Sequence, residues 1–486
     1  MAKSFITNKP AINMTMVGFG QAGSRMADEF AAYKNIEGQP TYNCLALNSN
    51  NGDLEGLKNI PEINRVSLNL GGLGKNPEMA MEILEENKDA KEKLKTFIRD
   101  KVRPSDDLVL FFAGLGGGTG TATIVKAIEE FYDFVNKPLL VKELEKIRIE
   151  ESPEELKNNQ QKYLNKALKR AQSKFVKIGV VVTLPLRNDG PDVLRQVNEF
   201  AKKIWKLANN PAKGIAFVTF ADNQHFYDEF NKIPVNNRNG INNYRDYGNK
   251  QISEIFHELN TATTSGGASV ILDAQDFRRA ITEHTGSLVL SKIEMPIKDV
   301  RSDDAIVDLV KKSFKQNNLH TPLKLVQQVK EKKTTKKVHH VGILSVLDGN
   351  NDFGGGAFLD DAISYLHKEI PMSGTVFSGY VNTKNDFNAT AYTFYKVDGL
   401  PERLEKGLVE EYKEFMERSN NYEFEKTEIQ SIDSKDDNEI KLDFNDLGLD
   451  NIFGDISGPE DIKEAEENTA PSVDELLASM NFSNND

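Results

Sequence analysis

A glycine-dense loop that directly follows an apolar strand is the feature that most constrains this chain. Residues 108–113 (LVLFFA) form a continuous apolar run, as expected of a strand covered on both faces of a parallel sheet. Five of the nine residues from Gly114 to Ala122 are glycine, and apolar residues at helical spacing begin at Ile124 and Ile128. Bare N–H groups at a helix N-terminus attract phosphate, because the helix dipole and the unpaired donors both favour an anion. The segment therefore predicts a strand–loop–helix unit that binds phosphate.

A second glycine turn lies earlier in the chain. The spacing GxGxxG at 18–23 follows an apolar stretch at 12–17, which alone would indicate a Rossmann dinucleotide site. A Rossmann site expects a carboxylate at the end of the next strand, 42–47, but none occurs before Asp53. Two glycine loops at neighbouring strand ends could instead share one polyphosphate. An NAD-binding Rossmann enzyme and a turn that binds nothing are the alternatives.

Strand and helix patterns alternate through the first half of the chain. Apolar strand patterns recur at 178–184 and 215–220, and a helix with one apolar face covers 250–259. Such alternation predicts an α/β fold with a doubly wound parallel sheet. We place this domain at 1–245 and a long central helix at 246–262.

A second, smaller α+β domain is expected at 263–410. Its last part shows a strand pattern, a helix pattern and two further strand patterns, at 341–347, 360–370, 375–381 and 389–397. This order suggests a small mixed sheet backed by a helix. A C-terminal helix and an acidic disordered tail, together at 411–486, complete the domain assignment.

Two charged stretches, 136–174 and 298–337, look inserted between these patterns. We expect the first to be helical and exposed to solvent. His339 and His340 follow the second and are expected at the surface rather than on a metal, since no third ligand is near in the sequence. Trp205 lies at helical spacing with apolar residues, which indicates a place in the core.

Negative charge is concentrated in the tail. The 486 residues carry a net charge of −13, but residues 421–486 hold 19 acidic and four basic side chains, so residues 1–420 carry +2. The tail has too little apolar surface to offset the entropy of ordering, and it either solubilises the protein or reaches a basic partner. An amphipathic helix pattern at 472–482 could dock in a partner's groove or bind nothing. The charge disfavours direct contact with nucleic acid or membrane.

The sequence also indicates an intracellular protein. Cys44 is the only cysteine, so no disulfide can form within the chain. Neither a signal-peptide pattern nor a run of about 18 apolar residues occurs. We expect a cytoplasmic location.

The glycine loops resemble those of a known family. GLGGGTGTA at 114–122 resembles the signature GGGTGTG of the tubulin/FtsZ superfamily, with Ala122 in place of the last glycine. GQAGSR at 20–25 is similar to the first phosphate loop of that family, and GGLGKNPEMA at 71–80 to the loop that approaches the γ-phosphate. VVTLPLRNDG at 181–190 resembles the sugar-binding loop.

Two segments of the chain resemble the plasmid- and phage-encoded TubZ branch of the superfamily. These are NKQISEIFHELN at 249–260 and LDAQDF at 272–277. The resemblance covers roughly residues 12–400 and is stronger in the nucleotide half. The long stretch at 136–174 and the acidic tail depart from the TubZ pattern.

The resemblance implies a site for GTP or GDP that also uses Mg²⁺. The residues that it assigns to the nucleotide are Gly20, Gln21, Ala22, Gly23, Asn48, Gly74, Lys75, Gly116, Gly117, Gly118, Thr119, Gly120, Thr121, Pro185, Asp189, Asn223 and Asn249. Asp189 stands where the family has a sugar-contacting glutamate, and Asn223 and Asn249 match two base-contacting asparagines. No residue of the chain is assigned to the metal itself.

Asp273 and Asp276 match the acidic residues of the family that position or polarise the attacking water. Their i, i+3 spacing puts them on one side of a helix or turn. A helix over 250–260 rises roughly 16 Å, so a chain that contacts the base at Asn249 carries Asp273 away from its own nucleotide. Asp273 would then act on the nucleotide of the next subunit in a head-to-tail stack, or would only cap a helix, as Asp commonly does.

The resemblance thus implies a GTPase that assembles head to tail into filaments, in the cytoplasm of a bacterial host cell, to segregate or position plasmid or phage DNA. Its partners would be further copies of itself and a DNA-bound adaptor protein that contacts the C-terminal tail. An FtsZ-type division-ring protein and a tubulin-like protein that binds nucleotide without assembly are the alternatives within the superfamily.

Overall fold

A computed structural model describes residues 9–103, 106–263, 269–321, 323–329, 332–350, 354–370, 372–383 and 387–422. The acidic tail from residue 423 onward and the amphipathic pattern at 472–482 lie outside the described residues. Among the described helices, none combines the length and the apolar character needed to cross a bilayer.

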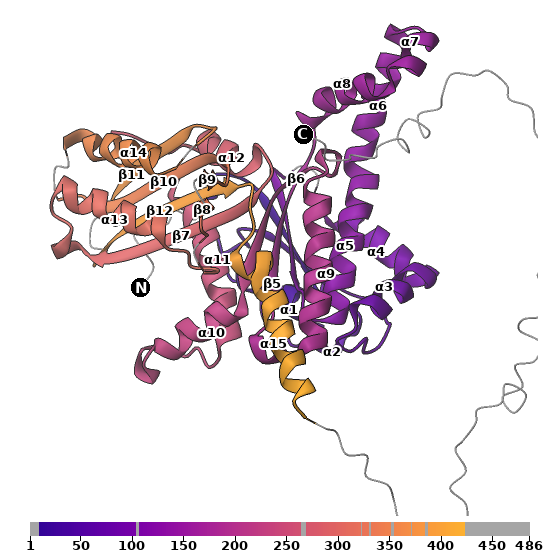
Figure 1. The fold of residues 1–486 in the computed structure, drawn as a ribbon, viewed down its shortest axis with the longest axis horizontal. Coiled ribbons are helices and arrows are strands. Elements are labelled where there is room, and N and C mark those ends of the chain that lie inside the picture. Colours follow the sequence, from indigo (N-terminus) through magenta and orange to yellow (C-terminus); the bar gives the residue numbers. More distant parts are fainter. Residues whose placement is uncertain are drawn as a thin grey trace, which may run out of the picture.

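One sheet of ten strands runs through the molecule, in the order β11–β10–β12–β7–β6–β5–β4–β1–β2–β3 (Figure 1). The strands of its first half are β1 (Met14–Phe19), β2 (Asn43–Asn48), β3 (Arg65–Ser67), β4 (Leu108–Gly114), β5 (Lys177–Leu184) and β6 (Ile215–Asp222). All neighbours in this half pair in parallel. The predicted doubly wound parallel sheet is therefore confirmed.

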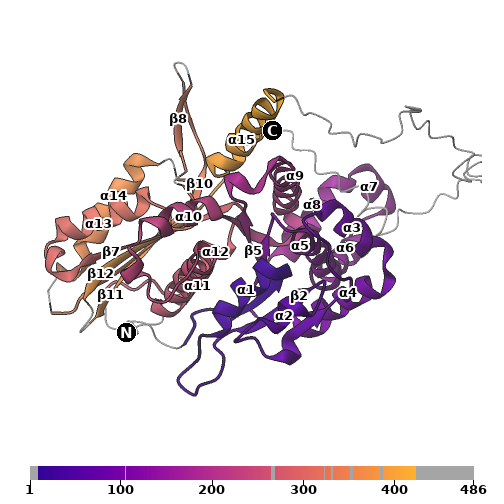
Figure 2. The same ribbon diagram turned by 90° about the horizontal axis from the view of Figure 1, so that it is seen from below.

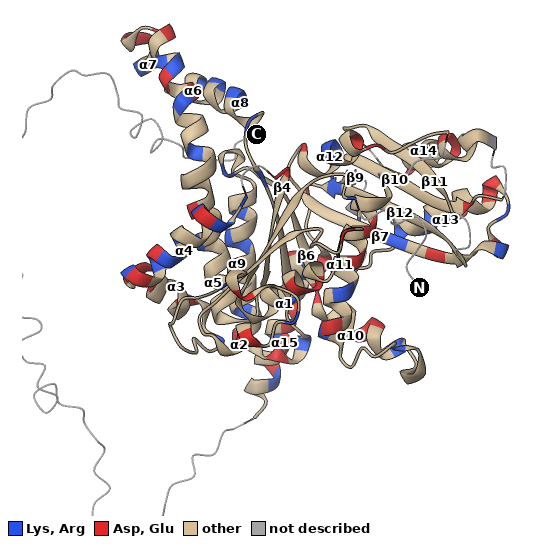
Figure 3. Cartoon of the chain, turned by 180° about the vertical axis from the view of Figure 1, so that it is seen from behind, with Lys and Arg blue, Asp and Glu red and all other residues tan. Residues whose placement is uncertain are grey.

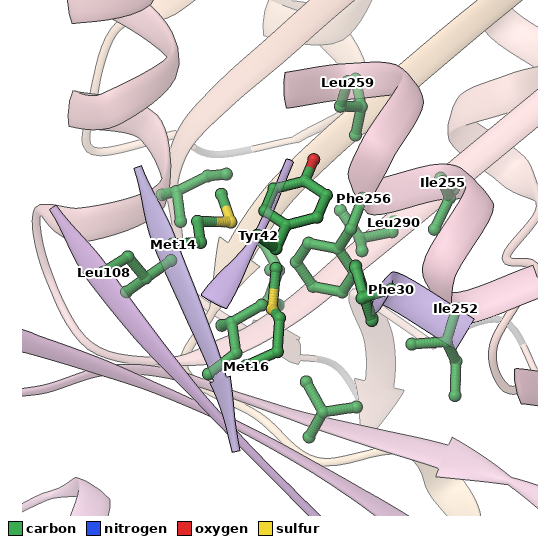
Figure 4. Packing of buried hydrophobic residues seen from close by; sticks show 14 of the residues in the cluster. Met14, Met16, Phe30, Tyr42, Leu108, Ile252, Ile255, Phe256, Leu259 and Leu290 are labelled. Carbon is green, nitrogen blue, oxygen red and sulfur yellow. The ribbon is translucent and has the colours of Figure 1, made fainter. Parts of the chain in front are cut away.

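Helices cover both faces of this parallel half. They are α1 (Gly20–Ala31), α2 (Gly52–Glu55), α3 (Pro77–Glu86), α4 (Lys88–Lys101), α5 (Gly118–Phe131), α9 (Pro191–Ala208), α10 (Asn223–Lys232) and α11 (Tyr244–Ala262). Side chains of β1 alternate between the two faces, as a period of two requires. Met14 and Met16 pack with Phe30 of α1 and Phe256 of α11, as Figure 4 shows, while Phe19 faces the cluster that holds α5 and α9.

The second half of the sheet is mixed. It consists of β7 (Ser287–Pro296), β10 (Val338–Asp348), β11 (Val376–Thr383) and β12 (Asn388–Val397). β10 pairs in parallel with β11, whereas β12 is antiparallel to both β10 and β7. A single parallel pair, Val218 with Ser287, joins this half to β6. A hairpin of β8 (Val326–Val329) and β9 (Lys332–Thr335) stands apart from the sheet.

The helices of this second region are α12 (Ala274–Thr282), α13 (Asp303–Lys315) and α14 (Ala357–Glu369). α13 lies inside the charged stretch 298–337, yet it is not an inserted element, because Ile306, Leu309 and Val310 are buried against the sheet with α14. The interpretation of 298–337 as an insertion is therefore wrong for this helix. The helix is amphipathic, with charged residues on its outer face and apolar residues on its inner face. The overall composition of the stretch is dominated by the charged residues and does not reveal the apolar face.

The charged stretch 136–174 is helical, as predicted, and forms a projecting arm of α6 (Lys137–Glu150), α7 (Pro153–Asn158) and α8 (Gln160–Gln172) (Figure 1). It is more than a solvated surface, because Leu140, Leu144 and Leu164 belong to an apolar cluster of its own. The base of the arm lies at the start of β5, where the amide of Asn136 bonds both the N–H and the C=O of Val176. Figure 3 shows both signs of charge interspersed over the arm and the helices below it.

Two histidines expected at the surface are buried. His339 and His340 follow Val338 at the start of β10, with 6% and 4% of their surface exposed. His339 Nε2 lies 2.6 Å from Asp398 Oδ1 and His340 Nε2 lies 3.1 Å from Glu283 Oε2. The prediction that these histidines lie at the surface was wrong, because the basic residues end at Lys337 and the next residue, Val338, begins a buried strand of the sheet. Trp205 is half-buried against Phe220, with ring centroids 6.3 Å apart.

Candidate functional site

A cleft of about 350 Å³ opens at the carboxyl ends of the parallel strands, between the starts of α1 and α5, where open α/β sheets generally bind ligands. Thirteen of the seventeen residues predicted to contact the nucleotide line it: Gln21, Ala22, Asn48, Gly74, Lys75, Gly116, Gly117, Gly118, Thr119, Gly120, Pro185, Asp189 and Asn223. The structure thus brings together segments spread over some 200 residues of sequence, from Gln21 to Asn223.

Three of the remaining predicted residues shape the cleft instead of lining it. A Cβ on Gly20, where φ is +66°, would lie 2.6 Å from the Gly120 nitrogen, and a Cβ on Gly23 would lie 2.1 Å from the Phe112 oxygen. These glycines let the starts of α1 and α5 touch and let α1 pack on β4. The buried Thr121 hydroxyl donates to the carbonyl oxygens of the glycine loop, at 2.6 Å and 3.1 Å.

Neither α1 nor α5 begins with a side-chain cap. The N–H groups of a first helical turn have no partner within the helix, so these two helices direct N–H donors and the positive ends of their dipoles toward the cleft. Elsewhere α10, α11, α12 and α13 each begin with a side chain that accepts such a bond. Helices α9 and α14 also begin without one, so what distinguishes α1 and α5 is that their starts lie together. The two open helix starts meet at one cleft, and this is the arrangement that binds an anion.

The glycines at the centre of the loop are not required by packing within the protein. A Cβ on Gly116 would have its nearest neighbour at 3.6 Å, and one on Gly117 at 3.8 Å, which are ordinary contacts. Gly118 differs, because its Cβ would lie 2.7 Å from the oxygen of Gly74 in the 71–75 loop. Gly116 and Gly117 therefore keep open the space in front of the helix donors.

The 71–75 loop covers one side of the cleft. Gly118 N–H donates to the Gly74 oxygen at 3.2 Å. Lys75 reaches toward Asp189 across the opening, with 3.9 Å between Nζ and Oδ1, and most of its side chain remains exposed. A cation with this freedom can reach a negatively charged ligand.

An amide–carboxylate network that sequence reasoning missed lies at the end of β2. Asp53 accepts from Gln21 Nε2 at 3.0 Å and from Asn48 Nδ2 at 2.9 Å. Ser49 contacts Thr119 through their hydroxyls at 3.0 Å. Asp53 was noticed only as an acid too late in the sequence for a Rossmann site, and its carboxylate instead fixes two predicted ligand-binding side chains.

On the far side of the cleft, one residue predicted to contact the base is not among the lining residues. Asn249 lies in the second turn of α11 and does not line the cleft, whereas Arg245, in the first turn, does. The helix starts earlier than its apolar pattern because Asn243 caps it, accepting from the N–H groups of Arg245 and Asp246 at 2.9 Å each. The spacing Asn243-x-x-Asp246 is a helix-start signal that would have located this turn.

Asn223, the first residue of α10, and Asp189, in the β5–α9 loop, are each held by hydrogen bonds within their own segment. Asp222 caps α10 by accepting from Gln224 N–H at 2.9 Å, which presents Asn223 to the cleft. Burial raises the pKa of the Asp222 carboxyl, and Arg403 beside it acts in the opposite sense. Asp189 accepts from Leu186 N–H at 2.9 Å.

The predicted catalytic pair lies away from this cleft. Asp273 is the exposed N-cap of α12 and accepts from Asp276 N–H at 2.8 Å. Partial burial and the Asp273 charge raise the pKa of Asp276. Arg278 pairs with Asp107 at 2.8 Å, which places α12 beside the amino ends of the strands, opposite the cleft. Neither carboxylate lines the cleft of its own chain.

Comparisons with known proteins find tubulin-like relatives for part of the sequence. No family model matches the chain. TubZ from Bacillus cereus is 23% identical over 305 residues, which are 61% of this chain and 58% of that protein, so the match spans little more than half of the relative. CetZ1 from Haloferax volcanii is 33% identical over 130 residues, 25% of this chain and 32% of that protein.

Solved structures resemble the chain over most of its length. A helical model of a two-stranded TubZ-Bt filament covers 86% of this chain and 91% of its own, with a TM-score of 0.63 and 19% identity. A GTPγS-form protofilament of TubZ from Bacillus thuringiensis serovar israelensis covers 86% and 96%, with a TM-score of 0.60 and 20% identity. The GDP-bound CetZ1 monomer from Haloferax volcanii covers 83% and 100%, with a TM-score of 0.56 and 17% identity. The fold expected from the sequence resemblance is therefore confirmed.

Proposed function

We propose that this chain, which has the tubulin-like fold and resembles TubZ, is a GTP-binding and GTP-hydrolysing protein that assembles head to tail into filaments. The observation that carries the proposal is the meeting of two uncapped helix starts, α1 and α5, at one cleft. A single helix start contributes only about 0.3–1 kcal/mol toward an anion at an exposed site. Two of them, with the loop N–H groups and Lys75, suit a polyphosphate.

A guanine nucleotide would lie across the cleft from these donors to the opposite loops. Its phosphates would meet α1 and α5. Its sugar and base would face Asp189 and Asn223, the positions that the resemblance assigns to them, and Arg245 stands where Asn249 was expected. The tubulin-like fold disfavours the Rossmann-enzyme alternative, and Asp53 bonds Gln21 and Asn48 rather than an open ribose position.

Magnesium would be held mainly by the nucleotide. The described residues bring together no group of three His, Cys, Asp or Glu side chains suited to a metal. Mg²⁺ commonly takes phosphate oxygens and water, with at most one or two carboxylates, so the cleft fits an ion that arrives with the phosphates near Gln21 and Thr119. When bound, Mg²⁺ would neutralise phosphate charge.

Assembly would complete the active site. α12 lies at the opposite end of the sheet from the cleft, so in a head-to-tail stack Asp273 and Asp276 of one copy would face the nucleotide of the next. A head-to-tail contact whose rotation does not close builds a filament. The charge of +2 on residues 1–420 allows copies to stack without strong mutual repulsion. There the two carboxylates would position or polarise the attacking water.

The cellular role that we propose is segregation or positioning of plasmid or phage DNA in the cytoplasm of a bacterial host. A DNA-bound adaptor would contact the tail after residue 422. An FtsZ-type division role is the alternative, and it rests on the same fold.

Binding and sedimentation test the proposal together. We expect the purified chain to bind GTP and GDP in preference to ATP and NADH, measured by calorimetry, and to sediment as filaments with GTP and Mg²⁺ while releasing phosphate. A chain that binds no guanine nucleotide, or that binds NADH instead, would contradict the proposed function. Binding without sedimentation would favour the non-assembling alternative.

A further inference from the structure

A buried arginine from the C-terminal part of the chain contacts the cleft loops. Arg403 lies in a π-helical turn (Arg403–Gly407) that leads into α15 (Leu408–Asn420), and only 7% of its surface is exposed. Its Nη1 donates to the Pro185 carbonyl oxygen at 2.6 Å and to Asp222 Oδ1 at 2.5 Å. Pro185 lines the cleft, and Asp222 immediately precedes Asn223. One guanidinium thus joins the two loops on the sugar and base side.

The other edge of the same guanidinium is held by α15. Arg403 Nε and Nη2 donate to the two oxygens of Glu411 at 3.0 Å and 2.9 Å, a paired geometry that fixes the plane of the group. Arg187, from the β5–α9 loop, pairs with Glu411 at 3.3 Å. Glu411 therefore connects α15 to both the arginine and the loop.

α15 is docked on the first domain by apolar contacts. Leu404 and Leu408 are buried in the cluster that holds α9, and Phe415 packs against it. Figures 1 and 2 both show α15 beside α9. The helix leads into the segment from residue 423 onward. Any partner that pulls on that segment would act on α15 first.

We propose that Arg403 is a positioning residue through which the docking of α15 sets the affinity of the cleft for the nucleoside part of its ligand. If α15 leaves α9 and carries the adjoining Arg403–Gly407 turn with it, the guanidinium is withdrawn from Asp222 as well. Asp222 then remains as a buried carboxylate without its cation, which is costly, and the β6–α10 turn that presents Asn223 loses its support. The phosphate donors of α1 and α5 have no bond to Arg403 in this network and are left in place.

This inference rests on the proposed function. A test with two ligands, GDP and inorganic triphosphate, distinguishes a failure of the inference from a failure of the proposed function. Calorimetry would compare GDP with inorganic triphosphate on the full chain and on Arg403→Gln. We expect GDP to bind the variant about tenfold or more weakly, while the affinity for triphosphate stays within about twofold. Arg418→Gln is the matched control, because Arg418 pairs with Glu414 on the exposed side of the same helix at 3.6 Å. It should behave as wild type.

Glu411→Gln is a second variant, for use if Arg403→Gln does not fold. It keeps the side-chain volume and one hydrogen-bond acceptor but removes the charge that pairs with Arg403. Because coupling between two sites is reciprocal, GDP should slow hydrogen exchange over residues 408–420 in wild type and not in Glu411→Gln. Equal GDP affinity in variant and wild type, or equal losses for GDP and triphosphate, would overturn the inference alone. A wild-type chain that binds no GDP would overturn the proposed function and the inference with it.

Discussion

Two helix starts, those of α5 and α12, differ in how their first N–H groups are used. α5 begins at Gly118 after glycines, without a side-chain cap, and its donors face a cleft. α12 begins with Asp273, whose carboxylate accepts from Asp276 N–H within the same turn. The start of α5 therefore leaves N–H groups available to a ligand, whereas at the start of α12 the Asp273 side chain already accepts from an N–H group.

The chain therefore has its proposed anion site and its candidate acid at opposite ends of one sheet. The N–H groups of an open helix start are satisfied by water or a ligand, so the start of α5 at the cleft is a candidate binding site. A capped start with an exposed carboxylate can still offer its remaining oxygen to a water on a neighbouring copy.

The largest effect is expected from Asp273→Asn. Asn is as good a cap as Asp, so folding, GTP binding and sedimentation should persist, while GTP turnover falls by about 10²–10⁴-fold because the charge that acts on water is lost. Phosphate release at matched polymer mass measures this. Unchanged turnover would show that Asp273 is only a helix cap.

Ser302→Ala is the matched control for that substitution. Ser302 caps α13 by accepting from Ala305 N–H at 3.3 Å, and α13 packs with α14 rather than carrying either candidate carboxylate. Its loss should lower the free energy of unfolding by about 0.5–2 kcal/mol. Turnover per folded chain should remain at the wild-type level.

Gly117→Asp would give α5 the kind of cap that α12 has. The site has room for a Cβ and its φ of −109° suits any residue. The new carboxylate would occupy the donors and repel phosphate, so GTP affinity should fall by at least about 100-fold, while the free energy of unfolding stays equal or rises by a few tenths of a kcal/mol. Calorimetry and urea titration measure the two quantities.

Gly117→Ala controls for added size in this experiment. It should weaken GTP binding less than the aspartate does, because it brings no charge. If both substitutions weaken binding equally, the loss comes from volume, and the uncapped helix start is not what binds the phosphates.

A smaller effect is expected from Thr121→Val, which removes the hydroxyl that holds the carbonyls of Gly114 and Gly117. Losing such bonds costs about 0.5–1.5 kcal/mol each, so GTP affinity should weaken by about three- to tenfold. Thr123→Val is the control, since the Thr123 hydroxyl makes the same kind of bond one half-turn later, to Thr119 O at 2.6 Å. Equal losses in both variants would assign the effect to the helix rather than to the loop.

The smallest effect on the nucleotide is expected from deletion of residues 423–486. These residues lie beyond α15, so GTP affinity and turnover should stay within about twofold of the full chain. Bundling or partner binding should change, because 19 acidic side chains lie in the segment from 421 to 486. Light scattering and phosphate release measure the two effects, and a loss of turnover would show that the tail supports the active site.

Local sequence determined the parallel half of the sheet and most of its cleft. The apolar run at 108–113 and the glycines that follow predicted β4, the loop and α5, because burial on both faces and bare N–H groups leave few other local structures. Thirteen predicted ligand-contacting residues line the cleft for the same reason: glycine loops at the ends of parallel strands meet at one edge. Some of these glycines are required because a side chain would not fit, as at Gly20, where a Cβ would collide with the backbone of Gly120.

Only the tertiary structure decided the contacts made between distant segments. It buried His339 and His340 with partners some 60 residues away in sequence, put Arg245 rather than Asn249 at the cleft, and brought Arg403 to Pro185. A charged side chain carries no local sign of the partner that will neutralise it, so its burial cannot be predicted from composition. The separation of Asp273 from the cleft was expected from helix length, but the Arg278–Asp107 pair that places α12 at the amino ends of the strands appears only once the chain is folded.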